Sequence, residues 1–284
     1  MLAGCGEPVV LDLFAPQPSV GTPRGDAAIA EEVDAGAPSR LGASHDAAAP
    51  SPDAQLTMEL SDSSLRTSSL ILRYDFSGQG TELVDRVGRA PARVIGGARL
   101  DGSGELALDG VDDYVDLPNG TLASLESATV VTWIAWGGGV CWQRVFDFGH
   151  NDMGEDKQGN ALASLFVTVA TCPGGQLAGM AELPSGHFVA AAEQPAPTSS
   201  TMQVALSFDA SRSLLTLYRD GVRVAETPAG FALAELGDVN AWLGRSQWVQ
   251  DFFARVSYDE FRIYDRALSR TEVRELFERG ADAP

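Results

Sequence analysis

Five tryptophans are the side chains of this sequence best suited to binding chemistry, because a flat aromatic face can pack against a sugar ring. Trp136, Trp142 and Trp248 stand next to glycine-rich or polar segments, so we expect them to be exposed and to form the ligand-binding set. Trp133 and Trp242 lie in apolar runs, which favours packing within a sheet. Trp133 and Trp136 have opposite parity in an extended strand, so one should face the core and the other the opposite face of the sheet.

Two cysteines, Cys141 and Cys172, adjoin glycine-rich turns, where loops can meet. In an exported protein such a pair predicts a disulfide, which would close a loop of roughly 30 residues and stabilise the fold by about 3 kcal/mol. The alternative is that both thiols are unpaired and that one or both are buried as small apolar side chains. The absence of Cys-x-x-Cys and His-x-x-x-His spacings disfavours a zinc site.

The titratable side chains give little support for catalysis. His150 and His187 lack a Gly-x-Ser-x-Gly nucleophile turn, and no glycine-rich phosphate loop joins a strand to a helix. Asp112 and the aspartates around it stand in a turn, and the acidic segment 150–156 lacks the spacing of an EF-hand, which favours solvated carboxylates in both places. We therefore expect that the protein is not an enzyme.

The first residues, 1–5, end in Leu-Ala-Gly-Cys and resemble the lipobox of bacterial lipoproteins, in which the cysteine is lipidated after signal cleavage. By analogy with lipoprotein sorting, the glycine after Cys5 favours the outer membrane. Residues 6–69 are rich in Ala, Pro and Ser with Phe14 as their one aromatic residue, which predicts a disordered tether. We expect an exported cell-surface lipoprotein, and the alternative for Cys5 is a free thiol.

The composition excludes two other classes of partner. The 284 residues carry 20 Lys and Arg against 39 Asp and Glu, a net charge of -19, which argues against a nucleic-acid surface and an anionic membrane face. No apolar run approaches the roughly 18 residues that span a bilayer, so membrane contact is expected only through the lipid anchor. The hydrophobic content of 44% suits one globular domain, which we place at residues 70–284.

Strands must position the tryptophans and cysteines. Short apolar-alternating runs, separated by turn residues at a spacing of roughly 8–12 residues, predict an all-β jelly-roll sandwich of two antiparallel sheets. Asp220-Gly221 predicts a two-residue type I′ hairpin. Ser269 and Glu272 form a capping box that begins a short C-terminal helix, and Gly280 ends it. The expected strands are 70–76, 92–95, 105–108, 114–117, 129–136, 144–148, 161–170, 176–182, 187–192, 202–208, 214–219, 222–226, 241–243 and 257–264.

Several motifs follow one another in a characteristic order. They are Tyr74-Asp75-Phe76, Leu108-Asp109-Gly110-Val111-Asp112-Asp113-Tyr114-Val115, Phe146-Asp147-Phe148-Gly149, Leu217-Tyr218-Arg219-Asp220-Gly221 and Asp259-Glu260-Phe261-Arg262-Ile263-Tyr264-Asp265. From about Leu70 to Phe277 the sequence therefore resembles laminin-G-like jelly-roll domains of the concanavalin A-like lectin fold.

This resemblance implies a metal and a class of ligand. Related domains often hold calcium, so Asp75, Asp85 and Asp259 are the expected calcium ligands near the sandwich edge. Glucanases of the same fold carry a Glu-x-Asp-x-x-Glu strand motif, which this sequence lacks. We expect a non-catalytic, surface-displayed module that recognises a carbohydrate or a glycosylated partner. The alternatives are an adhesive domain that contacts another protein without a glycan and, third, a glycoside hydrolase.

Overall fold

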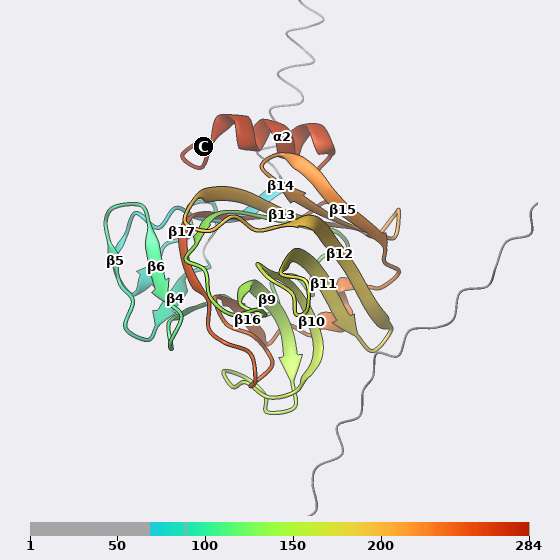
Figure 1. Cartoon of the computed structure of the whole chain (residues 1–284), viewed down its shortest axis with the longest axis horizontal. Helices are drawn as coiled ribbons and strands as arrows, with labels where there is room; N and C mark the ends of the chain where they lie inside the picture. The colour runs from blue at the N-terminus through green and yellow to red at the C-terminus, as the bar shows by residue number, and fades with distance from the viewer. Residues whose placement is uncertain (1–68, 89, 284) are drawn as a thin grey trace, which may run out of the picture. The chain divides into compact units, whose positions relative to one another are not determined.

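Two antiparallel β-sheets, packed on either side of one apolar core, make up the folded domain (Figure 1). The structure is a computed structural model that describes residues 69–88 and 90–283. The predicted β sandwich with one short C-terminal helix is confirmed. The predicted lipid anchor at Cys5 and the predicted tether over residues 6–69, apart from Ser69, lie outside the described residues and stay predictions.

The first sheet has seven strands and is organised around β17. Its order is β1 (Leu70–Tyr74), β17 (Arg255–Tyr264), β8 (Ala128–Trp136), β13 (Thr201–Asp209), β14 (Leu214–Arg219) and β15 (Val222–Pro228), with β6 (Leu106–Asp109) also beside β17. β1 pairs with the end of β17 near Tyr264 and β6 with the end near Arg255, while β8 pairs along the other edge.

The second sheet has eight strands and places β16 between strands from residues 144–195 and strands from residues 82–116. Its order is β12 (Gly186–Pro195), β11 (Gln176–Leu183), β10 (Ala161–Thr168), β9 (Arg144–Asn151), β16 (Asn240–Leu243), β7 (Tyr114–Asp116), β4 (Ala92–Ile95) and β3 (Glu82–Leu83). A small separate sheet pairs β2 (Gln79–Gly80) with β5 (Leu100–Asp101), and η1 (Leu233–Leu236) is a single 3-10 turn.

The core lies between the inward faces of the two sheets. On β9, Phe146 and Phe148 are fully buried in this core, so Asp147 between them points to the outer face. Burying each phenylalanine ring contributes roughly 1.5–3 kcal/mol to stability. On β8, Trp136 packs in the core and Trp133 packs in a separate cluster on the outer face. The predicted opposite orientation of these two tryptophans is confirmed.

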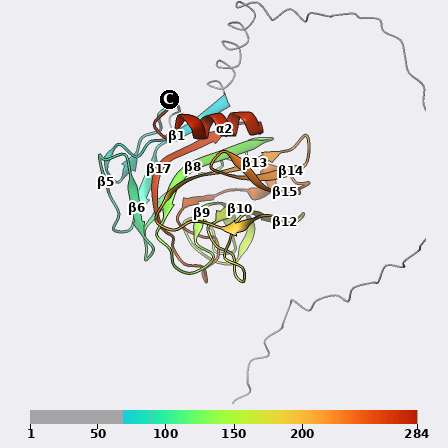
Figure 2. The same ribbon diagram turned by 45° about the horizontal axis from the view of Figure 1, so that its top comes forward.

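The helix and the hairpin form as predicted. Asp220 and Gly221 have φ angles of 51° and 72°, which a type I′ turn requires. α2 (Arg270–Arg279) begins after Ser269, whose side chain accepts a hydrogen bond from the Glu272 N–H. α2 covers the outer face of the first sheet (Figure 2), where Val273 packs into the Trp133 cluster. In the described part of the chain, no helix is long and apolar enough to cross a membrane.

The predicted disulfide is also present. Cys141 and Cys172 are bonded, which joins the segment between β8 and β9 to the segment between β10 and β11. These two segments meet because β9 and β10 are antiparallel neighbours, with Arg144 opposite Thr168. The disulfide therefore fixes the segment that carries Trp142 at one end of the second sheet.

Most expected strands match observed strands within one to three residues, and 92–95 and 214–219 coincide with β4 and β14. Three short strands, β2, β3 and β5, were not expected. Each has two residues, which is too short for apolar alternation to reveal.

Candidate functional site

The outer face of the second sheet carries a hollow of about 370 Å³ beside β9, β10 and β11. Phe166 on β10 points to this face because Leu165 and Val167, its neighbours along the strand, belong to the core. Met180 on β11 lies directly opposite Phe166. We call the hollow the aromatic groove. Its lining residues are Trp142, Arg144, Phe166, Met180, Glu182, Trp248, Gln250 and Asp251.

Two of the three predicted ligand-binding tryptophans meet in the aromatic groove. Trp142 has a φ of 65°, and its N–H donates to the carbonyl of Ala170 (2.8 Å), which holds it beside the disulfide. Trp248 lies in the segment 244–254 that follows β16, where it forms a parallel bridge with Gly159. Both side chains pack against the Phe166 cluster and stay partly exposed. The fold thus offers two aromatic surfaces to one ligand.

Arg144 forms the floor between these rings. Its guanidinium carbon lies 3.9 Å from the centre of the Phe166 ring, 5.3 Å from that of Trp248 and 5.7 Å from that of Trp142. A desolvated cation over an aromatic face contributes up to about 2 kcal/mol. Arg144 Nη1 also donates to the carbonyl of Trp142 (2.9 Å). Arg144 therefore holds the aromatic side chains at fixed positions around the groove.

Two carboxylates, Asp147 and Asp251, lie against the guanidinium of Arg144. Its Nη2 donates to Asp251 Oδ2 (2.7 Å), and its Nε lies 3.4 Å from Asp147 Oδ2. Asp147 also accepts hydrogen bonds from the Ser164 hydroxyl and the Gln247 N–H (3.0 Å). Full burial raises the pKa of Asp147 to about 6, against the opposing effect of Arg144. Burial raises the pKa of Asp251 as well.

The rim of the aromatic groove is acidic and accepts hydrogen bonds. Glu182, on β11, is about one-third exposed, and one of its carboxylate oxygens lies 2.5 Å from His187 Nδ1. Gln250 also lines the groove and is exposed, in the segment that carries Trp248 and Asp251. The groove therefore combines aromatic faces with carboxylate and amide oxygens, which suits a ligand that has both apolar faces and hydroxyl groups.

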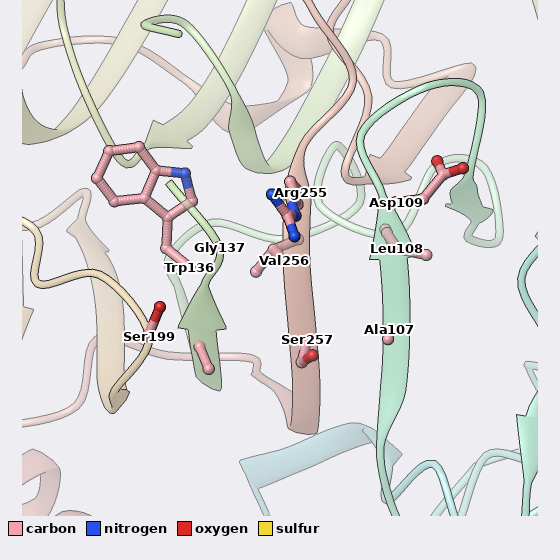
Figure 3. A pocket seen from close by; sticks show the side chains of 10 residues that line it. Ala107, Leu108, Asp109, Trp136, Gly137, Ser199, Arg255, Val256 and Ser257 are labelled. Atoms are coloured by element: carbon pink, nitrogen blue, oxygen red, sulfur yellow. The ribbon is translucent and has the colours of Figure 1, made fainter. Parts of the chain in front are cut away.

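Trp136, the third predicted ligand-binding tryptophan, does not reach the aromatic groove. It is only 8% exposed, and its Nε1 donates to Gln143 Oε1 (2.8 Å). The expected exposure of Trp136 is wrong, because the last residue of β8 still packs into the core although glycines follow it. Trp136 instead borders a different hollow of about 570 Å³ between β6, β17 and β8, where Arg255 and Asp109 stand at the strand ends (Figure 3).

Trp133 and Trp242 are sheet-packing residues, as the sequence predicts. Trp242 is fully buried, and the guanidinium carbon of Arg245 lies 4.2 Å from the centre of its ring and 4.4 Å from that of Tyr114. The guanidinium carbon of Arg262 lies 5.4 Å from the centre of the Trp133 ring. Their burial removes both tryptophans from the candidates for ligand contact.

The three predicted calcium ligands make separate contacts. Asp75 accepts from Arg86 Nε (2.8 Å), and buried Asp85 accepts from the backbone N–H of Arg73 (3.0 Å) and Val87 (3.1 Å). Burial, with smaller effects of neighbouring carboxylates, raises the pKa of Asp259. Asp75 and Asp85 therefore direct oxygens to donors of the chain itself, and calcium at the three aspartates stays a prediction.

Another acidic cluster lies at the turn before β7. Within residues 69–88 and 90–283, Asp109, Asp112 and Asp113 are the one group of three potential metal ligands whose ligand atoms all lie within 4.8 Å of one another. Asp113 accepts hydrogen bonds from the N–H groups of Gly97 (2.5 Å) and Ala98 (2.8 Å). The expected place in a turn is confirmed, but the expected solvation is wrong for Asp113, which is buried because its carboxylate accepts from these backbone N–H groups.

Sequence reasoning missed Arg144, Phe166, Met180, Glu182, Gln250 and Asp251. For Phe166 a signal exists, because the apolar run on β10 does not alternate, which indicates that both faces of the strand are covered. For Arg144 and Asp251 there is none, since 107 residues separate them and only the fold brings them together.

A sequence profile of the concanavalin A-like lectin/glucanases superfamily matches residues 109–274. No curated protein matches the chain in sequence.

Solved structures with the same fold include a domain of an enzyme and domains of neurotoxins. Domain 4 of AbnA, a GH43 extracellular arabinanase from Geobacillus stearothermophilus solved in complex with arabinotriose, is 19% identical, with a TM-score of 0.59 over 73% of this chain and 97% of that chain. A structure of botulinum neurotoxin type C, whose cell entry depends on two ganglioside molecules, is 12% identical, with a TM-score of 0.57 over 76% of this chain and 52% of that chain. The binding domain of botulinum neurotoxin DC in complex with rat synaptotagmin II is 13% identical, with a TM-score of 0.55 over 75% of this chain and 52% of that chain. At these identities the likeness shows the fold alone.

Proposed function

The chain belongs to the concanavalin A-like lectin/glucanases superfamily, and from this premise we propose that it is a non-catalytic module that binds carbohydrate in the aromatic groove. The observation that carries the proposal is the convergence of Trp142 and Trp248 on one open groove. Aromatic faces pack against the apolar faces of sugar rings, and the carboxylate and amide oxygens of the rim accept hydrogen bonds from sugar hydroxyls.

The comparisons support a glycan as the ligand. The arabinanase domain of the same fold was solved with arabinotriose, and the type C neurotoxin depends on gangliosides for cell entry. The fold is therefore compatible with glycan binding, and the aromatic groove supplies the local chemistry for it in this chain.

The carboxylates of the groove support a non-catalytic role. A glycosidase needs two carboxyl groups free to act on one glycosidic bond. Asp251 is held by Arg144 (2.7 Å) and the Ser246 hydroxyl (2.8 Å), and Asp147 lies fully buried beneath them. The Glu182 side chain is 35% exposed, against 10% for Asp251, so Glu182 presents the more open carboxylate in the lining of the groove.

Affinity electrophoresis through gels that contain soluble polysaccharides tests this proposal. We expect Trp142→Ala and Trp248→Ala each to weaken retention roughly tenfold, which corresponds to about 1.4 kcal/mol. Phe252→Ala is the matched control, because Phe252 is 57% exposed in the same segment as Trp248 and does not line the groove. If no polysaccharide retains the protein, or if the tryptophan variants are retained as the wild type is, the proposal is wrong.

A second candidate function is adhesion to another protein without a glycan. The observation that favours it is the exposure of Val249 (64%) and Phe252 (57%) beside the groove. A domain of the same fold was solved in complex with rat synaptotagmin II. In this case Phe252→Ala would weaken cell or partner binding more than Trp142→Ala does, and glycosidase treatment of the partner would change nothing.

Surface display and calcium binding belong to the proposal as separate parts. The disulfide supports an oxidising compartment. A lipid on Cys5, detected by mass spectrometry of the full-length chain and absent from Cys5→Ala, would support the anchor. A calcium-dependent rise in melting temperature that Asp259→Asn abolishes would support calcium at the predicted residues, and no rise would contradict it.

A further inference from the structure

The charge distribution of the aromatic groove restricts the glycans that it can accept. We propose, resting on the proposed function, that the groove selects uncharged sugars and rejects acidic ones such as uronic and sialic acids, with Glu182 as the specificity-determining residue.

Arg144 is the one cation in the lining of the groove, and it is not available to an acidic ligand. Its side chain is only 3% exposed, and it lies against the ring of Phe166. Nη2 donates to Asp251, Nη1 donates to the carbonyl of Trp142, and Nε lies 3.4 Å from Asp147. A sugar carboxylate would therefore find no free guanidinium with which to pair.

The other charged groups of the groove are carboxylates. Asp147 and Asp251 face one guanidinium, and Glu182 adds a third carboxylate at the rim, so carboxylates outnumber cations there. A ligand carboxylate in this groove would meet repulsion across low-dielectric aromatic walls, which screen charge poorly. Hydroxyl groups of a ligand, in contrast, can donate hydrogen bonds to the partly exposed carboxylate of Glu182.

His187 adds no positive charge that an acidic ligand could use. Its Nδ1 lies 2.5 Å from Glu182, so a protonated imidazole would pair with that carboxylate first. It would cancel the charge of Glu182 and leave no net positive charge for a ligand. The rejection of acidic sugars thus depends on how exposed and how charged the Glu182 carboxylate is.

The test compares neutral and acidic polysaccharides as probes. Wild type, Glu182→Gln and Glu278→Gln are run at 0.15 M NaCl through native gels that contain arabinan, xylan or galactan and through gels that contain polygalacturonate or alginate. At this salt concentration the Debye length is about 8 Å, so the net charge of the whole molecule is largely screened. Glu278→Gln makes the same charge change on α2, which covers the other sheet, and therefore controls for overall charge.

We expect the wild type to be retained by neutral probes at least about tenfold more strongly than by acidic ones. Glu182→Gln should raise the ratio of acidic to neutral affinity roughly three- to fivefold, the range of a single partly exposed charge, and Glu278→Gln should leave the ratio unchanged. If acidic probes retain the wild type as strongly as neutral probes or more strongly, and Trp142→Ala loses this retention, this inference is wrong and the proposed function stands. An unchanged ratio in Glu182→Gln would overturn the role of that residue, and retention by none of the probes would overturn the proposed function itself.

Discussion

The outer faces of the two sheets share a buried arginine that contacts an aromatic ring, but they differ in what covers it. On the first sheet, Arg262 stacks over Trp133 and pairs with Glu260 Oε1 (2.8 Å). On the second sheet, Arg144 stacks over Phe166 and pairs with Asp251. Both faces thus hold a buried arginine between an aromatic ring and a carboxylate.

The difference lies in what covers each arginine. α2 and the residues after it close the first face, where Arg262 Nη2 donates to the carbonyls of Ala281 (2.7 Å) and Ala283 (2.5 Å). On the second face the segment 244–254 covers the sheet only in part, and the aromatic groove stays open beside Trp248. A closed face of this kind contributes to stability, and an open one leaves aromatic surface for a ligand. We therefore expect substitutions on the two faces to have different readouts.

Removing Arg262 should give the largest effect on stability. Arg262→Met leaves Glu260 buried with Arg73 as its remaining partner (2.7 Å) and removes the donor to the carbonyls of Ala281 and Ala283. We expect the free energy of unfolding to fall by about 3 kcal/mol in urea denaturation, the lower end for a broken buried ion pair. Glycan affinity of the folded fraction should not change.

Arg274→Met on the exposed side of α2 is the matched control. Its pair with Glu278 is 70% and 57% exposed, so the free energy of unfolding should change by no more than about 0.5 kcal/mol. An equal loss of stability in both variants, or a loss of glycan affinity in Arg262→Met, would contradict the division between a closed and an open face.

On the open face, the buried carboxyl of Asp147 should make the free energy of unfolding depend on pH. The folded-state pKa of Asp147, about 6, lies above its ordinary value of 3.8 because the group is fully buried. A raised carboxyl pKa means that the folded state binds the proton more tightly, so its contribution to stability is present at low pH and is lost as pH rises through about 6. We expect the stability of the wild type relative to Asp147→Asn to fall by on the order of 2 kcal/mol between pH 4 and pH 7 in urea titrations. A difference that is flat or rises with pH would contradict the assignment.

The sequence predicted much of the closed architecture and little of the open groove. Apolar alternation, the Asp220-Gly221 turn and the Ser269 cap are local signals, and each gave the observed element. The disulfide followed from a pair of loop cysteines. The position of Trp136 was wrong, because a glycine after a strand shows where the strand ends and not which side of it is covered.

The aromatic groove could not be predicted because its parts come from distant segments. Trp142 lies before β9, Met180 on β11 and Trp248 after β16, and their proximity depends on the order of strands in the second sheet. Trp142 and Trp248 could be chosen as exposed aromatic residues from their polar surroundings. That they share one groove, with Arg144 as its floor, follows only from the three-dimensional structure.

The smallest change in stability should come from Glu272 on the helix that closes the first face, and its pH dependence should be opposite in sign to that of Asp147. Glu272 accepts from both Arg266 nitrogens (2.6 and 3.0 Å) and from the Ser269 N–H (2.8 Å). These bonds, with Arg266 contributing most, lower the pKa of Glu272 from 4.5 to about 2. A lowered carboxyl pKa contributes stability that is present above about pH 4.5 and is lost as pH falls towards 2, the reverse of Asp147.

We expect Glu272→Gln to lower the free energy of unfolding by about 1 kcal/mol at pH 7 in urea denaturation and by less at pH 3, because the side chain forms a capping box and a partly exposed ion pair. If Glu272→Gln and Asp147→Asn changed the pH dependence of stability in the same direction, the closed and open faces would not differ electrostatically as the structure indicates.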